Sequence, residues 1–137
     1  MTAHPDLLLI RGLPGAGKTT LAKKIAERLG YKHFEADQYF ETDEGYKFNP
    51  TFLPDAHAWC FKMAKEALQA GHKVVISNTF TTHWEMEPYY LYAMQNGHSF
   101  GTVSLRTQYK SIHNIPPETF QKMQDRWEMC PGWELEY

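Results

Sequence analysis

The stretch "RGLPGAGKTT", Arg11 to Thr20, decides the fold of this chain. It follows a continuous apolar run at residues 7–10 that is typical of a buried strand. It leads into residues 18–30, where apolar side chains recur at helical spacing until a glycine ends the pattern. The order is therefore strand, glycine-rich turn, helix. Because ligands of open parallel sheets bind where such turns leave the carboxyl ends of strands, we expect a ligand site here.

Residues 12–19 fit the pattern G-x-x-x-x-G-K-[ST] in the strand-to-helix setting that the pattern requires. Its glycines let successive backbone N–H groups surround an anion, and the following helix directs its positive end at the same point. We expect Lys18 to hold the β- and γ-phosphates of a nucleoside triphosphate and the Thr19 hydroxyl to bind Mg²⁺. The alternative is a plain turn with a solvated lysine. The expected nucleotide-binding residues are Gly12, Pro14, Gly15, Ala16, Gly17, Lys18, Thr19 and Thr20.

The composition is that of a globular chain with one domain, residues 1–137. Its apolar runs are too short to span a bilayer and no secretory signal opens the chain, so we expect a cytosolic protein that does not bind membranes. Cys60 and Cys130 lack close Cys or His partners, which predicts reduced thiols and no zinc site. The net charge of −2 disfavours a broad field that attracts nucleic acid.

Strand and helix patterns alternate along the rest of the chain. Short apolar or β-rich runs predict strands at 32–37, 73–77 and 99–105, with an edge strand at 132–137. Helical periodicity predicts helices at 55–71, 83–97 with Pro88 near its first turn, and 117–128, whereas 38–52 reads as an irregular polar and aromatic loop. This alternation predicts an α/β fold of the P-loop kinase type, with an open, mainly parallel sheet of four or five strands flanked by helices.

The glycine-rich loop alone does not distinguish ATPases, GTPases and kinases. A kinase needs a base for the acceptor hydroxyl, and Asp37 follows the second predicted strand where it could face the phosphates. The alternative is that Asp37 only caps the following turn. No N-K-x-D sequence of the guanine-reading type is present, which disfavours a GTPase.

Transfer of a phosphoryl group also needs a cation that neutralises its charge. Arg106 and Lys110 follow the fourth strand of the predicted parallel sheet, where small P-loop kinases carry a mobile lid, and both are candidates. His113 is a weaker candidate, and the alternative for all of them is a solvated or loop-anchoring role.

Five segments together resemble the P-loop polynucleotide kinase-like family, which includes phage 5′-hydroxyl polynucleotide kinases and small ATP-binding relatives. The segments are "IRGLPGAGKTTLA", "FEADQYF", "YKFNPTFLPDAHAWC", "VVISNTFTTHWEMEPY" and "HNIPPETFQKMQDRWE". The resemblance implies ATP, Mg²⁺ and phosphoryl transfer to a hydroxyl, often the 5′-OH of a nucleic acid end. It also implies that Asp37 is the general base and that Thr79 lines the acceptor side.

The chain departs from that family at several positions. Gln38 replaces a second Asp, and Phe40, on the substrate side, replaces an Arg that grips substrate phosphate. No acidic residue follows the third strand of the predicted sheet, so Mg²⁺ would rest on Thr19, phosphates and water, with Ser77 or Asn78 as further candidates. The lid is short, which leaves Lys110 as the best match to a lid cation.

Aromatic side chains gather beside Asp37, at Tyr39, Phe40, Tyr46, Phe48 and Phe52. They would either stack on a base or cover a small core. The sequence thus predicts an ATP- and Mg²⁺-dependent kinase whose acceptor is a nucleic acid end or a nucleoside-like molecule, with no protein partner evident. The competing prediction is an ATP-binding module with weak or no transferase activity that acts through a partner.

Overall fold

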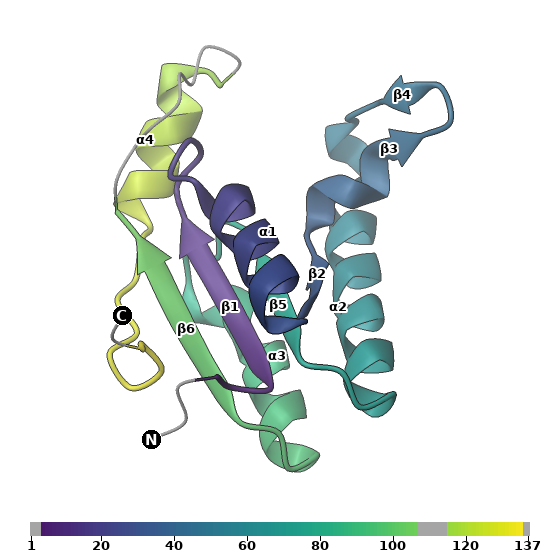
Figure 1. Cartoon of the computed structure of the whole chain (residues 1–137). Helices are drawn as coiled ribbons and strands as arrows, with labels where there is room; N and C mark the ends of the chain where they lie inside the picture. The colour runs from purple at the N-terminus through teal and green to yellow at the C-terminus, as the bar shows by residue number, and fades with distance from the viewer. Residues whose placement is uncertain (1–3, 107–114, 136–137) are drawn as a thin grey trace.

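A computed structural model describes residues 4–106 and 115–135. Four parallel strands form one sheet in the order β2-β5-β1-β6, as Figure 1 shows. Their bounds are Leu7–Gly12 for β1, Lys32–Phe34 for β2, Val74–Ser77 for β5 and Phe100–Leu105 for β6. The predicted parallel sheet is confirmed, and the carboxyl ends of all four strands lie along one edge, called here the carboxyl edge.

Helices cover both faces of the sheet because side chains of β1 alternate between them. Leu7 and Leu9 pack with residues of α2 and α3, whereas Leu8 and Ile10 pack with residues of α1. The helices are α1 Lys18–Leu29, α2 Leu53–Gln69, α3 His83–Gln95 and α4 Pro117–Asp125. In the described part of the chain, no helix is long and apolar enough to cross a membrane.

The segment between β2 and α2 is more ordered than its sequence indicates. Strand β2 ends at Phe34, and the next residues form the short helical turn η1, Ala36–Phe40. A hairpin of β3 (Glu41–Thr42) and β4 (Gly45–Tyr46) and the turn η2 (Pro50–Phe52) follow. The prediction of an irregular loop at 38–52 is therefore wrong. Residues 36–52 are called here the arm. Figure 1 shows the arm and α4 at the end of the molecule toward which β1 and β6 point.

Local hydrogen bonds close the hairpin of the arm. The Thr42 hydroxyl donates to the carbonyl of Gly45 at 2.7 Å, and Gly45 has a φ of 110° that disfavours other residues. Periodicity gives no warning of this hairpin, since each of its strands has two residues. A smaller difference concerns Pro88, which lies in the second turn of α3 rather than near the first.

The C-terminal residues cover the outer edge of β6. Thr102 donates its N–H to the carbonyl of Trp133 at 2.9 Å and accepts the N–H of Leu135 at 2.8 Å. The Glu134 carboxylate also accepts the N–H of Ser104 at 2.7 Å. The predicted edge strand is thus present as a single bridge between Thr102 and Glu134, and it covers polar groups that an open edge exposes.

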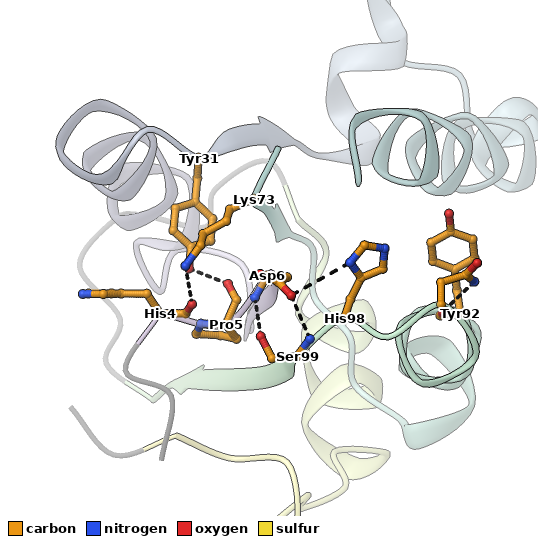
Figure 2. Close-up of polar contacts among 9 residues, drawn as sticks. His4, Pro5, Asp6, Tyr31, Lys73, Tyr92, His98 and Ser99 are labelled. Carbon is orange, nitrogen blue, oxygen red and sulfur yellow. Dashed lines mark hydrogen bonds and ion pairs between the residues drawn. The ribbon is translucent and has the colours of Figure 1, made fainter. Parts of the chain in front are cut away.

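The amino ends of the four strands lie opposite the carboxyl edge and are called here the amino edge. Residues just before each strand form hydrogen bonds that join these strand starts (Figure 2). Asp6 and Ser99 exchange two hydrogen bonds of 2.8 and 3.0 Å, which join the starts of β1 and β6. Tyr31, which precedes β2, donates its hydroxyl to Pro5, and Lys73, which precedes β5, donates to His4 at 2.8 Å. The amino edge is therefore held by bonds that involve residues next to all four strands.

Arg11 is the largest fully buried side chain, at 1% exposure. Its guanidinium donates to the carbonyl of Phe80 at 2.9 Å, the carbonyl of Thr81 at 3.2 Å and the Cys130 sulfur at 3.1 Å. It also lies 4.0 Å from the centre of the Trp127 ring. One side chain of β1 thus fastens the loop after β5, where Phe80 has a φ of 46°, to the C-terminal segment.

Replacing Arg11 with Met introduces an unbranched apolar side chain of roughly similar length and removes every hydrogen-bond donor of the guanidinium. We expect the free energy of unfolding to fall by about 2–4 kcal/mol, because the Phe80 carbonyl loses its buried partner. Urea denaturation measures the change, with Arg28→Met, an exposed position on α1, as the matched control. Equal stability of the two variants would contradict a central role for Arg11.

Candidate active site

The loop between β1 and α1 has the backbone shape that an anion site needs. Gly15 and Gly17 have φ values of 86° and 92°, which side chains disfavour, and α1 begins at Lys18. A Cβ at Gly12 would lie 3.0 Å from both the Ala16 Cβ and the Leu105 carbonyl oxygen. The loop therefore presents backbone N–H groups and a helix N-terminus at the carboxyl edge, an arrangement that fits a phosphate chain.

Lys18 folds across this loop. Its amine donates to the carbonyl of Leu13 at 3.2 Å. Burial lowers the pKa of Lys18 to about 8, and the charges of Glu35 and Asp37 oppose that shift. Two carboxylates thus lie close enough to act on the lysine of the loop.

Glu35 is the functional candidate that the sequence reasoning missed. Its carboxylate accepts hydrogen bonds from the Thr19 hydroxyl at 2.8 Å and the Ser77 hydroxyl at 3.3 Å. Burial raises the pKa of Glu35, hydrogen bonds from Thr19 and Ser77 lower it, and Asp37 raises it further. A carboxylate oxygen therefore lies beside the Thr19 hydroxyl. Glu35 follows β2, whereas the sequence analysis considers an acidic residue only after the third strand of the predicted sheet, which is β5.

The two other Mg²⁺ candidates are already engaged. Ser77 is bonded to Glu35 and lies 2.7 Å from His33 Nε2. Asn78 accepts the N–H of Ala36 at 2.9 Å and thereby holds the start of η1. Asn78 has a structural bond to the arm, and the acidic group near Thr19 is Glu35.

Asp37 does not cap the turn that contains it. The turn η1 begins at Ala36, its N-cap is Glu35, and the Gln38 side chain accepts the N–H of Glu35 at 3.3 Å. The Asp37 carboxylate is exposed and accepts the hydroxyl of Tyr46 at 2.9 Å. The capping alternative is wrong, and within residues 4–106 and 115–135 only one oxygen of Asp37 has a hydrogen-bond partner.

Phe40 and Thr79, both expected on the acceptor side, have different surroundings. Phe40 is 4% exposed and packs against Phe48 and Tyr46 at ring-centre distances of 5.0 and 6.4 Å. Contact between Phe40 and an acceptor is therefore a wrong prediction, because the ring forms the interior of the arm. Thr79 lies next to the loop, since its carbonyl accepts the N–H of Gly12 at 3.3 Å.

Arg106 faces a cavity on the other side of the loop. The cavity measures about 330 Å³, and its walls include Leu13, Pro14, Arg106, Phe120, Gln124 and Trp127. The Arg106 guanidinium lies 5.5 Å from the centre of the Trp127 ring. Lys110 and His113 fall outside the described residues. The cavity combines aromatic, apolar and amide groups, which suits a planar ring with polar edges.

The family described as AAA domain (AAA_33) matches residues 7–126. The chain belongs to this family. The matched region of this AAA domain extends from the first residue of β1 to the residue after α4, and so includes the loop, Glu35, Asp37 and the arm. The family match therefore covers the sheet and almost every candidate residue on the described part of the chain.

Two curated relatives of this AAA domain are similar over about three fifths of the chain. NEDD4-binding protein 2 from Homo sapiens is 39% identical over 85 residues, which make up 61% of this chain and 5% of that protein. Shikimate kinase from Thermobifida fusca is 32% identical over 83 residues, or 61% of this chain and 43% of that enzyme. The chain spans less than half the length of these relatives.

Solved kinases share the fold. A sugar kinase from Janibacter sp. has a TM-score of 0.64 at 17% identity, covering 93% of this chain and 80% of that one. The APS kinase CysC from Mycobacterium tuberculosis has a TM-score of 0.58 at 17% identity, covering 87% and 92%. The fold is that of P-loop kinases, a class that uses ATP with Mg²⁺. The narrower resemblance to polynucleotide kinases stays a prediction.

The lowered pKa of Lys18 predicts that nucleotide affinity falls with rising pH. Below pH 8 the amine is protonated and attracts phosphate, whereas above it the neutral amine does not. We expect the affinity for ADP to fall between pH 7 and 9, by up to about tenfold per unit above 8. Calorimetric titration measures this, and Lys18→Arg should bind with a flat profile because arginine stays charged. A flat profile in the unmodified chain would contradict the shift.

Proposed function

We propose that this chain transfers the γ-phosphoryl group of ATP to a hydroxyl group of a nucleic acid end or a nucleoside-like acceptor. The observation that supports it best is the position of Asp37, whose charge acts on Lys18 while its carboxylate faces solvent. An exposed carboxylate whose charge acts on the phosphate-binding lysine is suited to accept the proton of an attacking hydroxyl.

Each residue of the site then has a distinct role. The amides of Gly15 and Gly17 and the Lys18 amine hold the phosphates and keep the transferred group in line with the acceptor. Asp37 takes the acceptor proton as the new phosphorus–oxygen bond forms and the bond to the β-phosphate oxygen breaks. Arg106 or Lys110 would neutralise charge that develops during transfer.

We assign the Mg²⁺ position to Thr19 and Glu35. The Thr19 hydroxyl and the Glu35 carboxylate are hard oxygen donors, and they lie 2.8 Å apart at the end of the loop. Mg²⁺ retains waters and takes few protein ligands, so one hydroxyl and one carboxylate beside a phosphate chain suffice. When bound, the ion would neutralise part of the negative charge of the phosphates during transfer.

The cavity beside Pro14 is the proposed place of the adenine ring. Its volume lies within the range of about 300–1,000 Å³ that is typical of ligand pockets. Trp127 offers an aromatic wall, and the Gln124 amide is able to form hydrogen bonds with a base edge. Because the cavity adjoins the loop at Leu13, a base there would place its phosphates toward Lys18.

Asp37→Asn tests the proposed base. We expect turnover with an accepted hydroxyl compound to fall by about 10²–10⁴-fold, since the amide cannot take a proton, while ATP affinity stays unchanged. Transfer of label from γ-³²P-ATP and calorimetric binding measure the two quantities. Asp43→Asn, at the exposed tip of the same hairpin, is the matched control. Full turnover in Asp37→Asn would favour a nucleotide-binding module.

Glu35→Gln tests the proposed metal position. The amide oxygen still accepts from Thr19 and Ser77, so the fold is expected to persist. In the unmodified chain Mg²⁺ should tighten ATP binding, and in the variant this gain should shrink by about tenfold. Titration of ATP with Mg²⁺ and with EDTA measures the gain, and Glu27→Gln on the exposed side of α1 serves as control. The same gain in both variants would remove Glu35 from the metal position.

A further inference from the structure

Exposed aromatic faces lie beside Asp37 on the arm. Tyr46 and Phe48 are 56% and 49% exposed, although both also pack against the buried ring of Phe40. Tyr39 continues this group, with its ring 6.1 Å from that of Trp59 on α2. One side of these rings therefore packs against Phe40 or Trp59, while part of their surface faces solvent. Such exposed and fixed aromatic faces suit contact with a planar group.

Tyr46 connects this aromatic surface to the proposed base. Its hydroxyl donates to Asp37 Oδ1 at 2.9 Å, which leaves the second carboxylate oxygen available to an acceptor. An acceptor whose planar ring contacts Tyr46 therefore lies next to the second carboxylate oxygen of Asp37, which would receive the proton of the acceptor hydroxyl. The bond also fixes the Asp37 carboxylate to the hairpin, so Tyr46 is a positioning residue for the base.

The charge around these rings is strongly negative. Residues 35–57 contain six acidic residues and one lysine, Lys47, which forms an ion pair with Glu44. Partial burial, the bond to Asp37 and the charges of Asp37, Glu35 and Glu41 raise the pKa of Tyr46 to about 12. Three carboxylates from η1, the end of β2 and the hairpin thus act on the same hydroxyl.

Helices α2 and α3, next to the arm, add further negative charge near Asp37. Partial desolvation lowers the pKa of His57 on α2, while Glu85 on α3 and Asp37 oppose that shift. Glu85 is therefore one further carboxylate whose charge acts on this region, and the lowered pKa of His57 disfavours a positive charge on its ring. No described side chain of residues 35–57 other than Lys47 offers a fixed positive charge to an anionic acceptor.

We propose that the acceptor is a small hydroxyl compound that carries a planar ring and no negatively charged group, such as an unphosphorylated nucleoside. This inference rests on the proposed function and narrows its acceptor. The carboxylates of the arm repel phosphate and carboxylate groups, and the aromatic faces bind the ring. In the reaction the acceptor oxygen bonds to phosphorus, its proton passes to Asp37, and ADP leaves.

The test compares acceptors that share a ring and a 5′-hydroxyl but differ in negative charge. Each nucleoside is paired with its 3′-monophosphate, which has the same ring and the same 5′-hydroxyl, and with a 5′-hydroxyl oligonucleotide. Label transfer from γ-³²P-ATP should give the nucleoside at least a tenfold higher kcat/KM at low salt, and added salt should reduce the difference. A preference for the 3′-monophosphate or the oligonucleotide overturns this inference and leaves the proposed function standing. No transfer to any of them despite ATP binding overturns both.

Variants of the arm separate its charge from its rings. Glu41→Gln should raise kcat/KM for the 3′-monophosphate several-fold and leave that for the nucleoside unchanged, whereas Glu87→Gln on the exposed face of α3 should alter neither. Tyr46→Phe keeps the ring and should lower kcat, while Tyr46→Leu should also raise KM for the nucleoside. An unchanged KM in Tyr46→Leu, or equal effects of Glu41→Gln and Glu87→Gln, would overturn the inference.

Discussion

The carboxylate of Glu35 is the interaction on which the site depends. By accepting from Thr19 and Ser77, it joins the start of α1 to the ends of β2 and β5. Three chain segments that are distant in the sequence therefore meet at one carboxyl group. Strand pairing already places β1 and β2 on either side of β5, and the Glu35 carboxylate adds a direct link between the phosphate-binding loop and the residues that carry Asp37.

The sequence predicts what is local and misses what arises from pairing between strands. The loop at residues 12–19 is read correctly because its spacing and its strand-to-helix setting both lie within a few residues. Glu35 was missed because its role arises only when β2 lies beside β5, a pairing that periodicity does not report. A usable signal was present, since Glu35 and Asp37 alternate at the end of a strand at the ligand edge.

The arm shows a second limit of sequence reading. From the sequence, its aromatic residues could either stack on a base or pack in a small core. In the structure, some of them are buried and others are exposed. Phe40 is buried and packs under its neighbours, whereas Tyr46 and Phe48 keep exposed faces. Composition could not assign these places, because they depend on a hairpin whose strands are too short to leave a periodic pattern.

The bonds at the amino edge have a consequence for how such a domain can change over time. Residues next to each strand hold the strand starts together at the end of the sheet opposite the phosphate-binding loop (Figure 2). Insertions or exchanges in the loops of the carboxyl edge therefore leave the alignment of the strands intact. One sheet of this kind is able to acquire new acceptor arms in evolution, or by grafting in the laboratory, without having to solve its folding problem again.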